Sequence, residues 1–347
     1  MQYTRLGHSG LIVSRLAFGV MTFGSDPSQP AIYKVNRENA KAMIDKALDA
    51  GINLFDTADL YAGGQSEVML GELLGKRRLD VVIASKVGFR AGEAITHAGL
   101  SRRHILASCE ASLNRLNTDH LDLYILHKED PYAPLDETLE TLNDLVRAGK
   151  VRYVGYSNWS AWRAATALQM QKERGWAQFT SGQMYYSLVG RDVEHEIGPF
   201  MRATGLGLTV WSPLAGGFLS GKYTRENLGQ SDNRLSGFDF FPFDKERGFQ
   251  VVEKIRAIAN ECNASVAQIA LAWLFSKAVV ASIILGASKL SQLEDNLGAI
   301  DVKLSDSQIA ALDQITAPPS LYPNWFNSNM VDDKHKELFG TNRAEPF

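Results

Sequence analysis

The sequence has 347 residues, 45% of them hydrophobic and 22% charged, and its formal net charge is −3. This composition is typical of a globular protein and excludes the strongly basic surface of a nucleic-acid-binding domain. The longest apolar runs, such as residues 279–287, are far below the roughly 18 residues that cross a bilayer, so no membrane segment is predicted.

The chain alternates between short apolar runs and segments with helical spacing. Residues 4–16, with Gly7 and Gly10 in their middle, predict an N-terminal β-hairpin. Eight apolar or β-branched runs follow, at residues 16–19, 52–56, 81–84, 121–126, 151–156, 179–184, 208–211 and 282–285. Because continuous apolar runs suit strands that are buried on both faces, they predict a parallel sheet.

The segments between these runs carry residues suited to cap helices. Ser101 and Ser265 are placed as N-caps, and Gly149 is placed to end a helix. Eight strands separated by helices fit a closed (β/α)8 TIM barrel better than an open sheet, and no glycine-rich GxGxxG motif supports a Rossmann fold. We therefore predict an α/β protein with one domain, residues 1–347.

Two long segments fall outside this alternation, residues 215–244 and the tail at residues 318–347. Both contain exposed-loop residues together with aromatic side chains, at Phe238, Phe240, Phe241, Trp325 and Phe326. Long loops in compact folds tend to be functional lids or disordered. The aromatic residues favour lids over the C-terminal face of the barrel, and the tail is predicted to form part of a substrate pocket.

The two cysteines, Cys109 and Cys262, are too few for a disulfide framework and match no metal motif. Both are predicted to be reduced and buried in the core. Polar residues such as His8 and Ser9 interrupt the apolar stretch at the N-terminus, so no signal peptide is predicted. A cytoplasmic protein without a metal ion is expected.

Polar side chains follow three successive predicted strands: Asp56 and Tyr61, then Lys86, then His127. Catalytic residues of a barrel lie at the C-terminal ends of its strands, so these four are expected to converge. Each of them alone also fits a structural role, but four at successive strand ends favour a catalytic site.

These four residue types suit the reduction of a carbonyl group. Hydride addition to a C=O develops an alkoxide, which needs stabilisation and a proton. Tyr61 can supply the proton, and a neighbouring ammonium such as that of Lys86 lowers the pKa of a tyrosine. Asp56 can hold Lys86, and His127 can donate a hydrogen bond to the carbonyl oxygen.

Several tracts along the chain resemble the signature blocks of the aldo-keto reductase superfamily. In order they are GINLFDTADLYAGGQSEVMLGELL, VVIASKVG, LDLYILHKEDP, GKVRYVGYSNW, WSPLAGGFLSGKY and SIILGASKLSQLEDNLGA. The chain is most similar in character to bacterial members related to the β subunits of potassium channels. The resemblance implies a catalytic tetrad of Asp56, Tyr61, Lys86 and His127. It also implies the reversible, NADPH-dependent reduction of aldehydes or ketones to alcohols.

The resemblance further implies where the cofactor binds. Ser157, Asn158 and Gln183 match family residues that bind the nicotinamide carboxamide, and Trp211 matches an aromatic residue that stacks on the nicotinamide ring. The stretch that binds the pyrophosphate corresponds to Ser212, Leu214, Gly216 and Lys222. The composition of that stretch also fits a plain flexible loop.

The block that binds the adenosine phosphate corresponds to Gly286, Ser288, Lys289, Gln292, Asp295 and Asn296. A helix N-terminus there would suit a phosphate. Better-known relatives have Arg at the position of Gln292, and the loss of a bidentate Arg should weaken binding of the 2′-phosphate. NADPH remains the expected cofactor, but its discrimination from NADH is expected to be modest.

Substrate specificity in this fold comes from loops, and the candidate pocket residues are Phe23, Phe89, Tyr156 and Trp325. They are compatible with apolar or cyclic carbonyl substrates, but also with lids that pack on themselves. The partner expected is a small carbonyl compound, and either a monomer or a homo-oligomer fits.

Two other functions fit parts of the pattern. One is an NADP(H)-binding redox sensor or regulatory subunit with little turnover, and the intact tetrad speaks against it. The other is a barrel lyase or aldolase that uses Lys86 as a Schiff-base amine, against which the cofactor tracts speak.

Overall fold

The computed structural model describes residues 1–228, 235 and 240–339. Eight parallel strands close into a barrel in the order β10-β3-β4-β5-β6-β7-β8-β9. Their bounds are β3 Leu16–Gly19, β4 Leu54–Asp56, β5 Val82–Val87, β6 Leu121–Leu126, β7 Val151–Ser157, β8 Phe179–Tyr185, β9 Gly207–Trp211 and β10 Val280–Gly286. Each of the eight apolar runs contributes one strand, so the predicted (β/α)8 barrel is confirmed.

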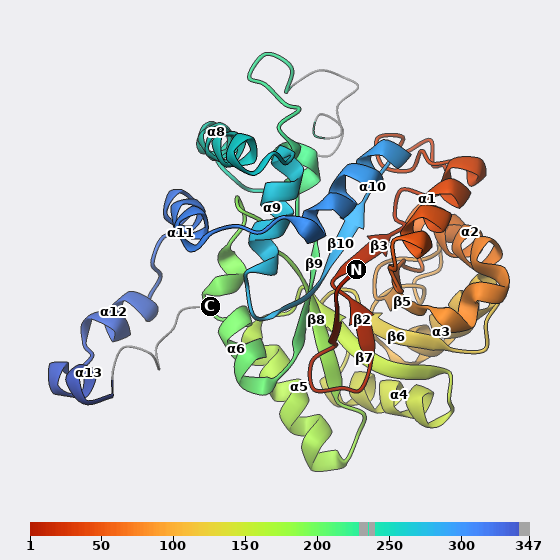
Figure 1. Ribbon diagram of the computed structural model, residues 1–347. Helices are drawn as coiled ribbons and strands as arrows, with labels where there is room; N and C mark the ends of the chain where they lie inside the picture. Colours follow the sequence, from red (N-terminus) through yellow and green to blue (C-terminus); the bar gives the residue numbers. More distant parts are fainter. Residues whose placement is uncertain (229–234, 236–239, 340–347) are drawn as a thin grey trace.

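Most of the helices surround the barrel, and α12 and α13 lie off its flank (Figure 1). The helices in the described residues are α1 Arg37–Asp49, α2 Gln65–Leu74, α3 Arg102–Leu116, α4 Leu135–Arg147, α5 Ala161–Arg174, α6 Ile197–Thr204, α8 Lys245–Cys262, α9 Val266–Phe275, α10 Leu290–Leu297, α11 Asp306–Ile315, α12 Asn324–Asn329 and α13 Asp333–Phe339. None of these helices has the length and apolar character needed to cross a membrane.

The N-terminal segment forms the predicted hairpin, with β1 (Tyr3–Arg5) antiparallel to β2 (Ile12–Ser14). Leu6 and Val13 are fully buried and pack against the first interior side chains of the barrel strands, such as Leu54. The hairpin therefore closes the end of the barrel at which the strands begin. The opposite end, where the strands finish, is left for the site.

Side chains along each barrel strand alternate between the barrel axis and the helices. The axis is lined by an apolar cluster that includes Leu54 on β4, Ala84 on β5 and Ile125 beside it on β6. Two positions further along, at the C-terminal end of each of these strands, the side chain again points to the barrel axis. The residues at these positions are Asp56, Lys86 and His127.

The predicted caps are present. The side chain of Ser101 accepts a hydrogen bond from the amide of His104, and Ser265 forms a capping box with Gln268. Gly149 follows α4 with a φ of 72°, which is the left-handed conformation that glycine adopts without strain. Both cysteines are free. Cys109 is buried as predicted, whereas Cys262 is only half-buried, because it ends α8 at the surface.

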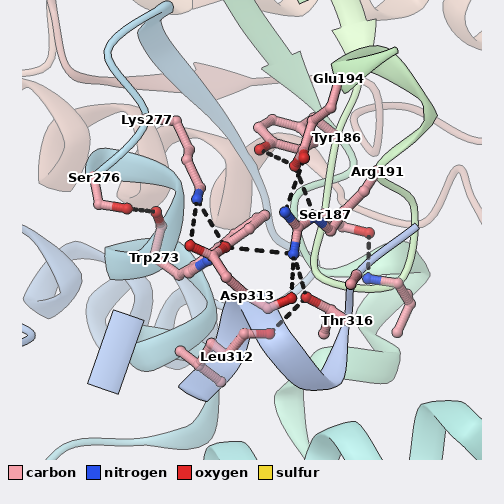
Figure 2. A network of polar contacts seen from close by, with 12 residues as sticks. Tyr186, Ser187, Arg191, Glu194, Trp273, Ser276, Lys277, Leu312, Asp313 and Thr316 are labelled. Atoms are coloured by element: carbon pink, nitrogen blue, oxygen red, sulfur yellow. Dashed lines mark hydrogen bonds and ion pairs between the residues drawn. The ribbon is translucent and has the colours of Figure 1, made fainter. Parts of the chain in front are cut away.

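The last helix of the barrel, α11, is held by the polar network in Figure 2. The carboxylate of Asp313 accepts hydrogen bonds from Lys277 Nζ (2.8 and 3.0 Å) and from the indole Nε1 of Trp273 (2.9 Å). Arg191 donates to the backbone carbonyl of Asp313 (3.0 Å) and to Thr316 Oγ1 (2.7 Å). Two segments far apart in the sequence, one at Arg191 and one at residues 273–277, therefore hold the end of α11 against the flank of the barrel.

The tail after α11 takes a different course from the one predicted. Figure 1 shows α12 and α13 lying beyond α11, off the flank of the barrel. Trp325 is 45% exposed, and its ring packs against those of Tyr322 and Phe326. The described tail meets the loop after β8, where Pro318 and Pro319 lie beside residues 188–192 and Asn324 Nδ2 donates to the carbonyl of His195 (3.1 Å), whereas Trp325 packs on its own neighbours. The reason is that α11 ends on the flank, and the chain leaves the barrel from there; residues 340–347 lie outside the described part.

Candidate active site

The four predicted tetrad residues come together at the C-terminal end of the barrel. Lys86 Nζ donates to Asp56 Oδ1 (2.6 Å), to the backbone carbonyl of Thr57 (2.7 Å) and to the hydroxyl of Tyr61 (3.4 Å). The rings of Tyr61 and His127 meet edge to face, with centroids 5.9 Å apart. Lys86 is fully buried and Asp56 is 5% exposed.

These contacts satisfy all three hydrogens of the Lys86 ammonium group. Burial disfavours the charged form of Lys86, but Asp56 and Tyr61 outweigh burial and raise its pKa. A permanently charged ammonium is a poor nucleophile, since Schiff-base formation needs a neutral amine. The geometry thus argues against a lyase or aldolase that forms a covalent adduct on Lys86.

Tyr61 and His127 have opposite pKa shifts. Burial raises the pKa of Tyr61, and the nearby Lys86 opposes this shift without reversing it. The expected lowering by Lys86 is therefore present but is outweighed by burial, so Tyr61 carries its proton at neutral pH. Burial, and then the charge of Lys86, lower the pKa of His127 well below its usual value. His127 is therefore neutral.

Asp59 is a buried acid beside the tetrad that sequence reasoning missed. It is 3% exposed, and among the described residues no side chain pairs with its carboxylate. The nearby Glu67 is fully buried and is bound by Arg115 Nε (2.6 Å) and Ser85 Oγ (2.5 Å). Burial, with the charge of Glu67 as a second cause, raises the pKa of Asp59 to about 7.

Asp59→Asn is expected to change the pH dependence of stability. The folded-state pKa of Asp59 is about 7 and an unfolded Asp has a pKa of about 3.9, so its stabilising contribution is complete below pH ~4 and is lost as pH rises through 7. The loss between pH 5 and pH 8 amounts to roughly 2–3 kcal/mol. Thermal unfolding at both pH values should show that Asp59→Asn gains stability relative to wild type at pH 8; an equal difference at both pH values would contradict the assignment.

The residues predicted to bind the carboxamide form one hydrogen-bonded group. Ser157 Oγ donates to the backbone carbonyl of Gln183 (2.7 Å), and Asn158 Nδ2 donates to Ser157 Oγ (2.9 Å). Trp211 Nε1 donates to Asn158 Oδ1 (3.0 Å). Asn158 has a φ of 58°, a left-handed conformation that asparagine tolerates better than most residues. This turn carries its amide across the ends of β7, β8 and β9.

An aromatic wall stands beside this group. The ring of Trp211 lies 5.2 Å from that of Tyr185 and 6.3 Å from that of Phe241, and Phe240 follows at 6.4 Å. Tyr185 was not predicted, although it lies two positions after Gln183 on β8 and so shares its face. Phe238, the other aromatic residue predicted here, lies outside the described residues.

The loop after β9, predicted to bind the pyrophosphate, is a series of tight turns. Ser212, Ala215, Gly216 and Gly217 all have positive φ, between 47° and 91°. Turns of this kind can direct backbone N–H groups at a phosphate, but the N–H groups of Ala215 and Gly217 donate within the loop, to the carbonyls of Ser212 and Leu214 (both 2.9 Å). A Cβ atom at Gly217 would lie 3.2 Å from Lys222 Nζ, so the ammonium group of Lys222 sits directly against this loop. Leu214, between these turns, is half-buried.

At α10, the predicted adenosine block lies at the helix N-terminus after Gly286. Lys289 is the N-cap residue, and Gln292 Oε1 accepts hydrogen bonds from the amide (2.9 Å) and hydroxyl (3.2 Å) of Ser288. Asp295 accepts from Ser265 Oγ (2.8 Å) and Asn296 is buried. The side chains of Gln292 and Asp295 are therefore already engaged within the protein.

The predicted pocket residues separate into two groups. Phe89 lies at the site, since its ring meets that of His127 edge to face at 4.8 Å. Phe23 and Tyr156 are buried at 0% and 1% exposure. Tyr156 packs against Trp159, because Ser157 points to the barrel axis and its neighbour on β7 must face the helices. Phe23, Tyr156 and the tail residue Trp325 therefore do not form the wall of a pocket in this structure.

Comparison with known proteins agrees with this arrangement. Residues 15–317 match the model of the Aldo/keto reductase family. The chain belongs to the aldo/keto reductase family. A rice (Oryza sativa subsp. japonica) protein named as a probable voltage-gated potassium channel subunit beta is 37% identical over 87% of this chain and 92% of its own length.

Two further relatives of this aldo/keto reductase carry enzyme names. An uncharacterized oxidoreductase, YrpG, of Bacillus subtilis is 34% identical over 92% of this chain and 97% of its own. Versiconal hemiacetal acetate reductase of Aspergillus parasiticus is 31% identical over 93% of this chain and 99% of its own. Family membership and these names support an oxidoreductase that acts on carbonyl compounds with a nicotinamide cofactor.

Proposed function

We propose that this aldo/keto reductase reduces aldehydes or ketones to alcohols with NADPH, with Tyr61 as the proton donor. The observation that carries the proposal is the contact of the buried Lys86 ammonium with both Asp56 and the Tyr61 hydroxyl. It places a protonated phenol and a fixed positive charge at the point where negative charge develops on the carbonyl oxygen.

Each residue has a separate task in this proposal. NADPH, when bound, supplies the hydride. Tyr61 gives its proton to the oxygen of the reduced carbonyl, and Lys86 stabilises the resulting phenolate. His127 is neutral and donates a hydrogen bond to the same oxygen, which orients the carbonyl. Because burial raises the pKa of Tyr61, the acid is protonated at neutral pH, and reduction is expected to fail only at alkaline pH.

The residues assigned to the cofactor suit NADPH. The ammonium of Lys222 lies against the glycine turn at Gly216 and Gly217 and supplies positive charge for a pyrophosphate. Asn158 and Gln183 supply amide groups for the carboxamide.

The experiment that tests it follows NADPH oxidation at 340 nm with a panel of aldehydes and ketones, alongside direct titration of NADP⁺ binding. Turnover above the rate without enzyme is the expected result. Tight NADP⁺ binding without turnover in either direction would instead favour the redox-sensing subunit, a reading that the channel-subunit name of one relative keeps relevant. Failure to bind any nicotinamide cofactor would overturn both.

Gln292→Arg is expected to sharpen the preference for NADP⁺ over NAD⁺. In the wild type, Gln292 Oε1 is used by Ser288, whereas an arginine can bind the 2′-phosphate in a bidentate manner. One or two charge-assisted hydrogen bonds should tighten NADP⁺ binding roughly tenfold or more. Calorimetry with both cofactors provides the measurement, and Gln292→Met is the matched uncharged control. Equal tightening of NAD⁺ would contradict the assignment of Gln292 to the phosphate subsite.

A further inference from the structure

Both oxygens of the Asp56 carboxylate are engaged, and they bind different partners. Oδ1 accepts from Lys86 Nζ at 2.6 Å, and Oδ2 accepts from Gln183 Nε2 at 2.8 Å. Asp56 and Gln183 lie 127 residues apart in the sequence, on β4 and β8. Gln183 is 4% exposed, so this second hydrogen bond is as buried as the ion pair. Gln183 is thus separated from the Tyr61 hydroxyl by only Asp56 and Lys86.

The orientation of the Gln183 amide follows from its partner. An ionised carboxylate can only accept hydrogen bonds, so the NH₂ group of Gln183 must face Asp56, and its Oε1 faces elsewhere. Gln183 therefore keeps a single acceptor atom, which suits the N–H of a carboxamide. Its NH₂ group is already committed to the tetrad.

The other side of Gln183 leads to His127. The Gln183 backbone carbonyl accepts from Ser157 Oγ, which in turn accepts from Asn158 Nδ2, and the same Nδ2 donates to the carbonyl of His127 (3.1 Å). One hydrogen-bonded chain therefore joins Lys86 and Asp56 to His127 by way of the residues assigned to the carboxamide.

We propose that Gln183 is a positioning residue for the catalytic acid: its amide holds the Asp56 carboxylate at the angle that places Lys86 against the Tyr61 hydroxyl. In addition, Gln183 couples the binding of a carboxamide at its Oε1 to the ionisation of Tyr61. This second part rests on the proposed NADPH-dependent function, whereas the first part does not.

Loss of the Gln183 donor has a defined electrostatic consequence. The charge on Asp56 Oδ2 loses its hydrogen bond, so Asp56 attracts the Lys86 ammonium more strongly and presents more negative potential to Tyr61. Both changes disfavour the phenolate of Tyr61. A residue that only filled space at this position would not shift the ionisation of Tyr61.

The test places 3,5-difluorotyrosine at position 61 of the full-length protein and follows its ¹⁹F resonance against pH without any cofactor. Gln183→Met, which keeps the side-chain length but has no donor, should raise the titration midpoint by about half a pH unit. Gln183→Glu brings a second carboxylate to Asp56 and should raise it further. Tyr156→Phe, the control on the neighbouring strand β7, changes a side chain that packs against Trp159 on the helix side of the barrel, leaves the Gln183–Asp56 contact intact and should not move the midpoint.

Equal midpoints for wild type, Gln183→Met and Gln183→Glu would overturn the positioning role, and the two variants guard against one of them failing to fold. Addition of NADP⁺ then tests the link: the shift it causes at position 61 should be smaller in Gln183→Met than in wild type, and an equal shift would overturn the link. If NADP⁺ does not bind to the wild type, the proposed function and the link fail together, while the cofactor-free series still decides the role of Gln183.

Discussion

Replacement of Tyr61 by Phe is expected to reduce carbonyl turnover by roughly 10²–10⁴-fold, the usual size of a general-acid contribution. The variant loses one hydroxyl that contacts Lys86 and keeps the ring that packs against His127. The loss should therefore fall on kcat, with NADP⁺ affinity and thermal stability close to wild type. Steady-state kinetics, a binding titration and a melting curve provide the three measurements.

Tyr33→Phe is the matched control. Tyr33 is 7% exposed and belongs to the small apolar cluster that Tyr61 packs against. Its Phe variant therefore shows the effect of removing a tyrosine hydroxyl beside Tyr61. Its variant is expected to retain turnover. If both variants lost turnover to the same extent, the effect would belong to the packing of this cluster and not to proton donation by Tyr61.

Replacement of Lys86 by Met is expected to cost both activity and stability. Turnover should fall at least as far as in Tyr61→Phe, because the phenolate loses its stabilising charge. In addition, Asp56 would be left as an unpaired carboxylate at 5% exposure, which typically costs about 3–5 kcal/mol. Chemical denaturation measures the second effect independently of any assay.

The double variant Asp56→Asn/Lys86→Met separates the two effects. It removes both charges of the buried pair (Nζ to Oδ1, 2.6 Å), and such neutral replacements often restore stability. The expected result is a recovered free energy of unfolding with turnover still absent. Recovery of turnover would show that the charge of Lys86 is dispensable and would contradict the proposed role.

The barrel and the convergence of the four tetrad side chains could be predicted from the sequence, because both depend on strand periodicity. The apolar runs mark the strands, and the position of Lys86 at the end of one run already implies that its side chain shares a face with Ala84. The same alternation along β7 and β8 places Tyr156 and Ser157 on opposite faces, and Tyr185 on the same face as Gln183. Tyr156, predicted to line the pocket, instead faces the helices because it alternates with the inward-facing Ser157 on β7.

Other features depend on packing between distant segments and leave no local signal. Asp59 lies close enough to Glu67 and Arg115, on α2 and α3, for both of their charges to act on its pKa. The course of the tail depends on where Asp313 is anchored, which involves Lys277 and Trp273 far from it in sequence. The Gln183–Asp56 hydrogen bond likewise joins strands from opposite parts of the barrel.

The anchoring of α11 has a practical consequence for handling the protein. Because Arg191 and Lys277 hold Asp313 and Thr316 to the flank, the chain beyond Thr316 leaves from an anchored position, and α12 and α13 lie off the barrel (Figure 1). A dye, an affinity handle or a surface tether attached along α12 would leave the mouth open to solvent. The tail is thus the natural position for immobilising this reductase on an electrode or a bead.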